Sequence, residues 1–244
     1  MSKISVIIPA RDEEKTIGNV VKRVPTVFSS SVSVIVIVDE GTNDHTASVA
    51  KKAGAKVINQ GATRGLAEAF RTGLKEALKE NADIIVTIDA DAQYFPEDIP
   101  RLIAPILAGK ADVVLGSRFA GRIEGMPLGK KIGNAFFTWI TRKITGVPIT
   151  DSQTGFRAMT KEVAENLEIT SDYTYTQEMI IDAAYKGFRI EEEPISFAKR
   201  RYGKSRLIPN LHTYAVRAIK TIVECYIKNL SKFKRHQAKR SSMR

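Results

Sequence analysis

Residues 84–93, IIVTIDADAQ, place three potential metal ligands directly after an apolar run: Asp89, Asp91 and Gln93, at every second position. Residues two apart in an extended chain point to the same side, so these groups would converge where a buried strand ends. Carboxylates brought together repel each other, and a divalent cation would relieve the repulsion. Oxygen ligands of this kind suit Mg²⁺ or Mn²⁺. The spacing therefore predicts a metal site, although Asp91 could instead begin a turn or cap the helix near Pro96.

Two carboxylates and one amide are too few ligands for a closed structural metal site. Mg²⁺ usually takes one or two protein carboxylates and fills its remaining positions with water and phosphate oxygens. The pattern therefore favours a site that binds a metal together with a diphosphate.

Charged residues also follow the two earlier apolar runs. Asp39 comes directly after VIVIV, and the first run continues into IPARDEE, which contains Arg11 and Glu13. Asp12 and Asp44 are expected to cap the helices that follow them. Asp39 has no capping position, and its carboxylate could accept hydrogen bonds from a ribose or a base. Three neighbouring strand ends of this kind predict one polar cleft.

Short β-rich runs alternate with helical patterns over the first two-thirds of the chain. The expected strands are residues 4–9, 32–38, 55–59, 83–89 and 111–116, and the expected helices are residues 13–23, 44–53, 65–80 and 97–107. This alternation indicates an α/β domain whose mostly parallel sheet has helices on both faces. Ligands of such domains bind at the carboxyl ends of the strands.

The alternation stops after residue 116. We expect a loop over 117–127, helices over 128–145 and 174–186, an irregular segment over 147–157, one or two strands broken at Pro194, and from residue 208 an amphipathic helix. We divide the chain into an α/β domain (1–207), a C-terminal amphipathic helix (208–235) and a basic tail (236–244).

The composition limits the classes of function. A hydrophobic content of 43% is enough for a sizeable core, and the single cysteine, Cys225, excludes an internal disulfide. No long apolar run is present, so we expect no signal peptide and no transmembrane helix. The net charge is +11, and residues 228–244 contribute seven of these charges. That segment could be a solvated tail, or it could contact an anionic membrane surface or nucleic acid.

Several stretches together resemble family 2 glycosyltransferases of the GT-A fold: SVIIPARDEE, VDEGTNDHT, RGLAEAFRTGL, IDADAQYFPEDIP and VVLGSRF. Within that family the chain is most similar to the polyprenyl-phosphate (dolichyl-phosphate) hexose synthases. The resemblance implies a GT-A (Rossmann-like) domain that transfers a hexose, with inversion, from a nucleotide sugar to a polyprenyl phosphate. Gln153 resembles the glucosyl-type members, which slightly favours a UDP-sugar over GDP-mannose.

The resemblance also implies roles for individual residues. The donor nucleotide would be held by Pro9, Arg11, Glu13, Asp39, Arg64 and Asp89. The metal, Mg²⁺ or Mn²⁺, would be held by Asp89, Asp91 and Gln93. Catalytic positions would be Asp91, Asp151 and Arg118. The acceptor phosphate would be bound by Arg118, Lys130, Lys131, Arg200, Arg201 and Lys204. Any one of these basic residues could instead be a solvated surface charge.

The chemistry of the acceptor decides what Asp151 is needed for. A phosphate monoester has a second pKa of about 6, so at pH 7 it is already an anionic nucleophile that needs cations more than a base. We therefore expect Asp151 to contact the donor sugar or to position a cation. The alternative function is transfer to a sugar hydroxyl with Asp151 as general base.

A lipid acceptor requires contact with a membrane. The C-terminal helix would lie in the membrane interface, or it would pack on the core or on a second subunit of a homo-oligomer. We expect a peripheral protein on the cytoplasmic face. We expect no nucleic-acid partner, because acids in a cleft repel phosphates when no metal is bound.

Overall fold

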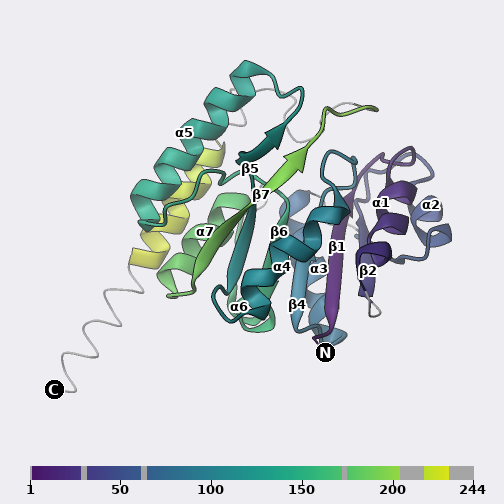
Figure 1. The fold of residues 1–244 in the computed structure, drawn as a ribbon, viewed down its shortest axis with the longest axis horizontal. Helices are drawn as coiled ribbons and strands as arrows, with labels where there is room; N and C mark the ends of the chain where they lie inside the picture. The colour runs from purple at the N-terminus through teal and green to yellow at the C-terminus, as the bar shows by residue number, and fades with distance from the viewer. Residues whose placement is uncertain (1, 29–31, 62–64, 172–174, 204–216, 231–244) are drawn as a thin grey trace.

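A seven-stranded mixed sheet forms the centre of the molecule (Figure 1). The computed structural model describes residues 2–28, 32–61, 65–171, 175–203 and 217–230. The strands are β1 (Ile4–Ala10), β2 (Val32–Val38), β3 (Lys56–Asn59), β4 (Ile84–Thr87), β5 (Val113–Ile123), β6 (Arg157–Thr160) and β7 (Ile190–Phe197). Their order across the sheet is β3-β2-β1-β4-β6-β5-β7. Only β6 runs antiparallel to its neighbours, β4 and β5.

Helices cover both faces of this sheet, as the sequence predicts. They are α1 (Ile17–Arg23), α2 (Thr46–Lys52), α3 (Leu66–Lys79), α4 (Ile99–Leu107), α5 (Leu128–Thr145), α6 (Lys161–Asn166) and α7 (Thr176–Tyr185), with short 3₁₀ turns η1 (Pro25–Val27) and η2 (Pro96–Asp98). A last helix occupies residues 217–230.

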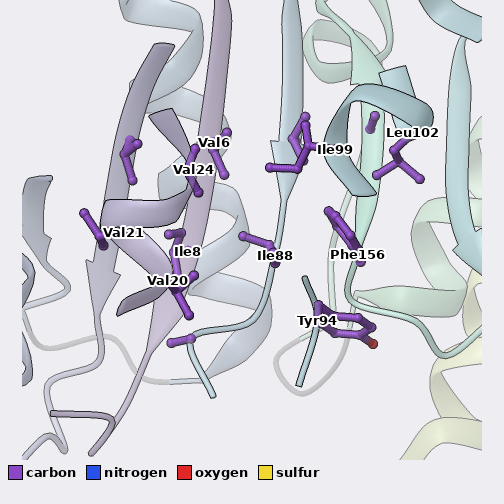
Figure 2. Close-up of a cluster of buried hydrophobic side chains, with 14 of the residues drawn as sticks. Val6, Ile8, Val20, Val21, Val24, Ile88, Tyr94, Ile99, Leu102 and Phe156 are labelled. Carbon is purple, nitrogen blue, oxygen red and sulfur yellow. The ribbon is translucent and has the colours of Figure 1, made fainter. Parts of the chain in front are cut away.

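Two apolar cores separate the helices by face. On one face α1, α2 and α4 pack against the sheet, and Figure 2 shows part of this cluster: Val6, Ile8, Val20, Val21, Val24, Ile88, Tyr94, Ile99, Leu102 and Phe156. On the other face α3, α6 and α7 pack against Ile7, Ile35 and Ile85. Gly73 lets α3 approach the sheet closely, because a Cβ there would lie 2.3 Å from Ile7 Cγ2. The two-sided burial explains the continuous Val/Ile runs of β1, β2 and β4.

The second half of the sheet departs from the predicted elements. The loop predicted for 117–127 is wrong over 117–123, because β5 continues to Ile123 and pairs with β7 beyond an irregularity between Ser117 and Arg122. The predicted break at Pro194 is also absent, since β7 runs through it as one strand. Proline is tolerated there because β7 is an edge strand. The short strand β6 was not predicted.

The last helix forms an outer layer with α5. Ala218, Ile222 and Cys225 are buried in a small cluster with Phe137 of α5 and Ile181 of α7. Figure 1 shows the two helices beside each other at the edge of the molecule. One apolar side of the predicted amphipathic helix therefore packs on the domain. Residues 208–216 and the basic tail, 236–244, lie outside the described residues. Among the helices the structure describes, none is long and apolar enough to cross a bilayer.

Candidate active site

The end of β4 brings the predicted metal ligands to the carboxyl edge of the sheet. Asp89 and Asp91 follow the strand, and a left-handed residue, Ala92 (φ 59°), turns the chain so that the Gln93 amide donates to Asp91 Oδ1 at 3.0 Å. Asp91 thus also begins a turn, which is the alternative role that the sequence allowed for it. The Gln93 side chain donates to the carbonyl of Ala198 at 2.8 Å. Gly155 makes room for Asp89, because a Cβ at that position would lie 2.6 Å from Asp89 Oδ1.

The neighbouring ends of β1 and β2 supply Glu13 and Asp39. Glu13 is buried after β1, where its backbone amide donates to Thr46 Oγ1 at 2.8 Å and its carboxylate accepts from Thr16 Oγ1 at 3.1 Å. Asp39 is buried after β2 and accepts hydrogen bonds from the Gly41 and Gly65 amides at 2.8 and 2.9 Å. These contacts fix both carboxylates in place at the same edge of the sheet.

The other residues predicted at this edge of the sheet differ in the contacts that they make. Arg11 follows β1 and lies 3.6 Å from Asp39 Oδ1, while Pro9 lies within β1, paired with β2. Asp44 does not take the predicted N-cap position of α2, which is His45, but it accepts from the amide of Thr46, the first residue of the helix, at 2.9 Å. Asp12 does not cap α1. It has φ 53° and accepts instead from the amide of Asn43 at 2.8 Å, which ties the β1 end to the β2 end.

A guanidinium bridges two of the acids. Arg200 Nη2 donates to Asp91 Oδ2 at 2.7 Å and to Glu13 Oε1 at 3.0 Å. Glu13 comes from the end of β1 and Asp91 from the end of β4, so Arg200 joins the segment after β7 to both strand ends. The sequence predicts all three residues for the site, but it predicts Arg200 for the acceptor side rather than for the acids.

The electrostatic cost of gathering these acids appears at Asp89 and Glu13. Burial and the nearby Asp91 raise the pKa of Asp89 to about 7, against the opposing effect of Arg118 and Arg200. Burial also raises the pKa of Glu13, partly offset by Arg200. A group of acids that is hard to ionise without a cation is suited to bind one.

A second buried ion pair lies beside the first group. Arg118 Nε and Nη2 donate to the two carboxylate oxygens of Asp151 at 2.6 and 2.8 Å, and the Arg118 amide adds a third bond at 3.1 Å. Both side chains are almost fully buried. The Arg118 guanidinium also lies 5.2 Å from the ring centre of Phe197. Two residues predicted separately as catalytic are therefore each other's partners.

The loop that contains Asp151 is held by groups that the sequence did not suggest. Glu192 of β7 accepts from the Thr150 amide and hydroxyl, both at 2.7 Å, and from the Asp151 amide at 2.9 Å. Arg157 is fully buried and donates to the carbonyls of Ser152, Thr154 and Thr176. Glu192 lies in a run of three glutamates, so no sequence pattern distinguishes it. Arg157, in TGFRAM, looks like an ordinary strand residue.

The remaining basic residues are not drawn into this group. Lys130 and Lys131 are exposed in the first turn of α5, and Arg201 is exposed after Arg200. None of the three forms an ion pair with another described residue. Arg64 and Lys204 lie outside the described residues.

The donor set fits a divalent cation that needs further ligands. Carboxylate oxygens from Asp91 and Glu13 already hold a cationic group, and Asp89 lies close enough to raise their mutual repulsion. Within the described part of the chain, no three His, Cys, Asp or Glu side chains are grouped so as to hold a metal by themselves. Oxygens from a ligand would have to complete the shell.

The fold and the acidic strand-end site define an α/β domain of the GT-A type. The chain can be superposed on a glucosyl-3-phosphoglycerate synthase from Mycobacterium tuberculosis, crystallised with Mn²⁺, UDP and phosphoglyceric acid, with a TM-score of 0.73 over 92% of this chain and 78% of that one. The sequence identity is 21%, so this likeness concerns the fold.

Sequence comparison gives the family. Residues 5–168 match Glycosyl transferase family 2, and the chain belongs to that family. It is 38% identical over 209 residues to an uncharacterized protein of Methanocaldococcus jannaschii, with 84% of this chain and 85% of that one covered. It is 35% identical over 228 residues to the UDP-N-acetylglucosamine–dolichyl-phosphate N-acetylglucosaminyltransferase of Methanococcus voltae, covering 83% and 88%. The predicted family and fold are confirmed, and the chain is a glycosyltransferase.

Proposed function

We propose that this glycosyltransferase moves a sugar from a nucleoside-diphosphate donor, with a UDP-sugar slightly favoured, to a polyprenyl phosphate with inversion. The observation that supports this most is the pairing of acids and cations at one sheet edge: Asp89, Asp91 and Glu13 beside the half-buried Arg200 and the buried Arg118. The acids suit a metal-bound diphosphate, and the cations suit an anionic acceptor. The name of the Methanococcus voltae relative agrees with both substrates.

A divalent metal, Mg²⁺ or Mn²⁺, would be held by Asp89, Asp91 and the amide oxygen of Gln93. When bound, it would neutralise charge that develops on the leaving diphosphate. Asp39, with Arg11 beside it, would bind the nucleoside. Glu13, which follows β1 at the same edge of the sheet, would also contribute to donor binding.

On the acceptor side the chain's own task is to place an anion and exclude water. A phosphate monoester is already ionised at pH 7. It needs to be held in line with the anomeric carbon, for which buried cations are suited. The pair with Asp151 fixes the Arg118 guanidinium through Nε and Nη2, and Nη1 is not used by this pair. Asp151 would thus act as a positioning residue.

This arrangement favours a phosphate acceptor over a hydroxyl acceptor. A general base must have an oxygen within reach of the proton that it removes. Both carboxylate oxygens of Asp151 are engaged by Arg118. If Asp151 were a base, Asp151→Asn would abolish turnover while Arg118→Ala would be milder. We expect Arg118→Ala to be at least as harmful, because it removes the cation itself.

We further propose that the outer layer of α5 and the last helix rests on an anionic membrane surface at the cytoplasmic face. On α5, Leu128, Ile132, Phe136 and Trp139 are exposed by 72, 63, 49 and 57%. On the last helix Ile219, Val223 and Ile227 are exposed by 42, 46 and 61%. Both stripes have the three-to-four spacing of interfacial helices. Exposed basic residues flank them: Lys130, Lys131, Arg142, Lys143, Arg217 and Lys220.

Trp139 provides a direct test of membrane contact, because it is the single tryptophan of the chain. Its fluorescence should shift to the blue on vesicles that contain anionic lipid and less on neutral vesicles. Ile132→Glu should reduce this shift. Leu107→Glu is the matched control, since Leu107 is 58% exposed but lies on α4. Equal effects of the two substitutions would contradict the proposed surface, and self-association without vesicle binding would indicate a second copy instead.

A donor screen tests the proposed activity. The purified protein would be incubated with Mn²⁺, a short polyprenyl phosphate and, one at a time, UDP-glucose, UDP-N-acetylglucosamine and GDP-mannose. The expected result is a lipid-linked sugar with at least one donor and loss of product with EDTA. No lipid-linked product from any donor would overturn the proposal.

A further inference from the structure

The positive charge between Glu13 and Asp91 is the guanidinium of Arg200. The Nη2 atom of Arg200 touches one oxygen of each carboxylate, at 3.0 and 2.7 Å, and all three side chains are largely shielded from solvent. An arginine guanidinium does not lose its proton in proteins, so this group keeps its positive charge between the two acids. A positive charge of the chain itself therefore offsets part of the negative charge of these two carboxylates.

The segment around Arg200 is attached to the donor edge at several points. Ala198 accepts from the Gln93 side chain, and its amide donates to the Gln93 carbonyl at 2.8 Å. Further along, Tyr202 lies with its ring centre 5.8 Å from Lys15 Nζ. Tyr202 and Gly203 line a hollow together with residues 12–15. We call residues 198–203 the strap. Through Ala198 and Arg200 it contacts Gln93 and Asp91, two of the residues proposed for the metal.

A divalent ion bound at Asp91 would compete with this guanidinium for the same carboxylate. Two cations held by one carboxylate would lie close together, and like charges repel strongly in a partly shielded site. Binding of a metal with the donor would therefore favour displacement of the Arg200 head group. The displaced guanidinium would stay near the site, because Gln93 holds the strap at Ala198.

We propose that Arg200 is the counter-ion of the donor site in the donor-free enzyme. The incoming divalent cation and donor diphosphate displace it, and the released guanidinium then binds the acceptor phosphate. Donor binding would thus create part of the acceptor site, so that acceptor affinity depends on donor occupancy. This inference rests on the proposed function, because it takes the donor metal and the acceptor phosphate as the two ligands.

The first experiment measures Mn²⁺ binding to the nucleotide-free protein from the electron paramagnetic resonance signal of free Mn²⁺. Arg200→Ala should bind Mn²⁺ about tenfold more tightly than the parent, because one competing positive charge is gone. Arg201→Ala is the matched control: it removes the same charge from the adjacent, exposed position. We expect little change for that variant. Arg200→Lys should stay near the parent because it keeps the charge.

Two results would overturn the inference. One is an unchanged or weaker Mn²⁺ affinity in Arg200→Ala. The other is an equal gain in Arg201→Ala, which would show an effect of net charge alone. If Arg200→Ala does not fold, as judged by circular dichroism, Arg200→Gln takes its place in the same comparison.

A second experiment measures the coupling, which must be reciprocal between the two ligands. The affinity of the parent for farnesyl phosphate should rise when Mn²⁺ and UDP are present, and Arg200→Ala should lose most of that rise. An equal rise in both proteins would refute the role of Arg200. Both measurements use binding alone. A protein that transfers sugar but shows no effect of Arg200→Ala refutes only this inference, whereas one that shows the effect but makes no product refutes only the proposed function.

Discussion

The buried pair of Arg118 and Asp151 should contribute strongly to stability as well as to the site. Asp151→Ala would leave the Arg118 guanidinium buried without its carboxylate, and Arg118→Ala would leave the Asp151 carboxylate buried without its cation. Breaking one partner of such a pair costs about 3–5 kcal/mol of unfolding free energy. For a chain of this length 1 kcal/mol corresponds to about 2–4 °C, so the midpoint of thermal unfolding should fall by about 6–20 °C.

The assay is thermal unfolding followed by circular dichroism for a double-mutant cycle. The double variant Arg118→Ala/Asp151→Ala should cost clearly less than the sum of the single variants, because it leaves no unpaired buried charge. The exposed pair Arg122–Glu124, with an N–O distance of 2.9 Å, is the matched control. Glu124→Ala should cost less than about 1 kcal/mol, as exposed ion pairs do. An Asp151→Ala effect no larger than that of Glu124→Ala, or simple additivity in the cycle, would refute the reasoning.

Three further outcomes follow from the same contacts. Gly155→Ala should weaken Mn²⁺–UDP binding in calorimetry by about tenfold or more, because its Cβ would press on Asp89 Oδ1, a clash of the overpacking kind that costs about 1–3 kcal/mol; unchanged affinity would contradict the placement of Asp89. Glu192→Gln should alter the pH dependence of stability. Burial raises the pKa of Glu192 above its ordinary 4.5, so the folded state holds this proton better than the unfolded state, and the parent loses stability as the pH rises from 4.5 through the raised pKa. Denaturant titrations give the free energy of unfolding of both proteins at each pH. Over that interval the variant should gain stability relative to the parent, and a difference that does not change with pH would refute this. Finally, Trp139→Asp should lower co-sedimentation with anionic vesicles several-fold, and unchanged co-sedimentation would contradict contact between α5 and the membrane.

The first half of the fold could be predicted because its signals are local. Valine and isoleucine runs with helical patterns between them give a parallel sheet, and the alternation of Asp89 and Asp91 after such a run places them at its carboxyl edge. The same logic fails after residue 116. β6 has only four residues, Arg157–Thr160, and it follows a polar loop. The extension of β5 through a Gly- and Arg-rich stretch depends on pairing with β7, which is distant in sequence.

The residues of the site could be predicted better than their partners. Arg118 and Asp151 are 33 positions apart, and Arg200 and Asp91 are 109 apart, so no local pattern reports that they meet. Glu192 of the edge strand β7 holds the Asp151 loop. Because Glu191 and Glu193 are also glutamates, the sequence does not indicate which of the three makes this contact. Which of several equivalent charges reaches a buried partner is decided by tertiary packing.

A comparison of two lipid acceptors tests the central claim most directly. The donor that proves active would be offered with a polyprenyl phosphate and, separately, with the matching polyprenol, which differs only by the phosphate. We expect a lipid-linked sugar with the polyprenyl phosphate alone, because the buried cations and the engaged Asp151 suit an ionised nucleophile. Comparable product from the polyprenol, or from a free sugar hydroxyl, would contradict the account and point to Asp151 as a general base.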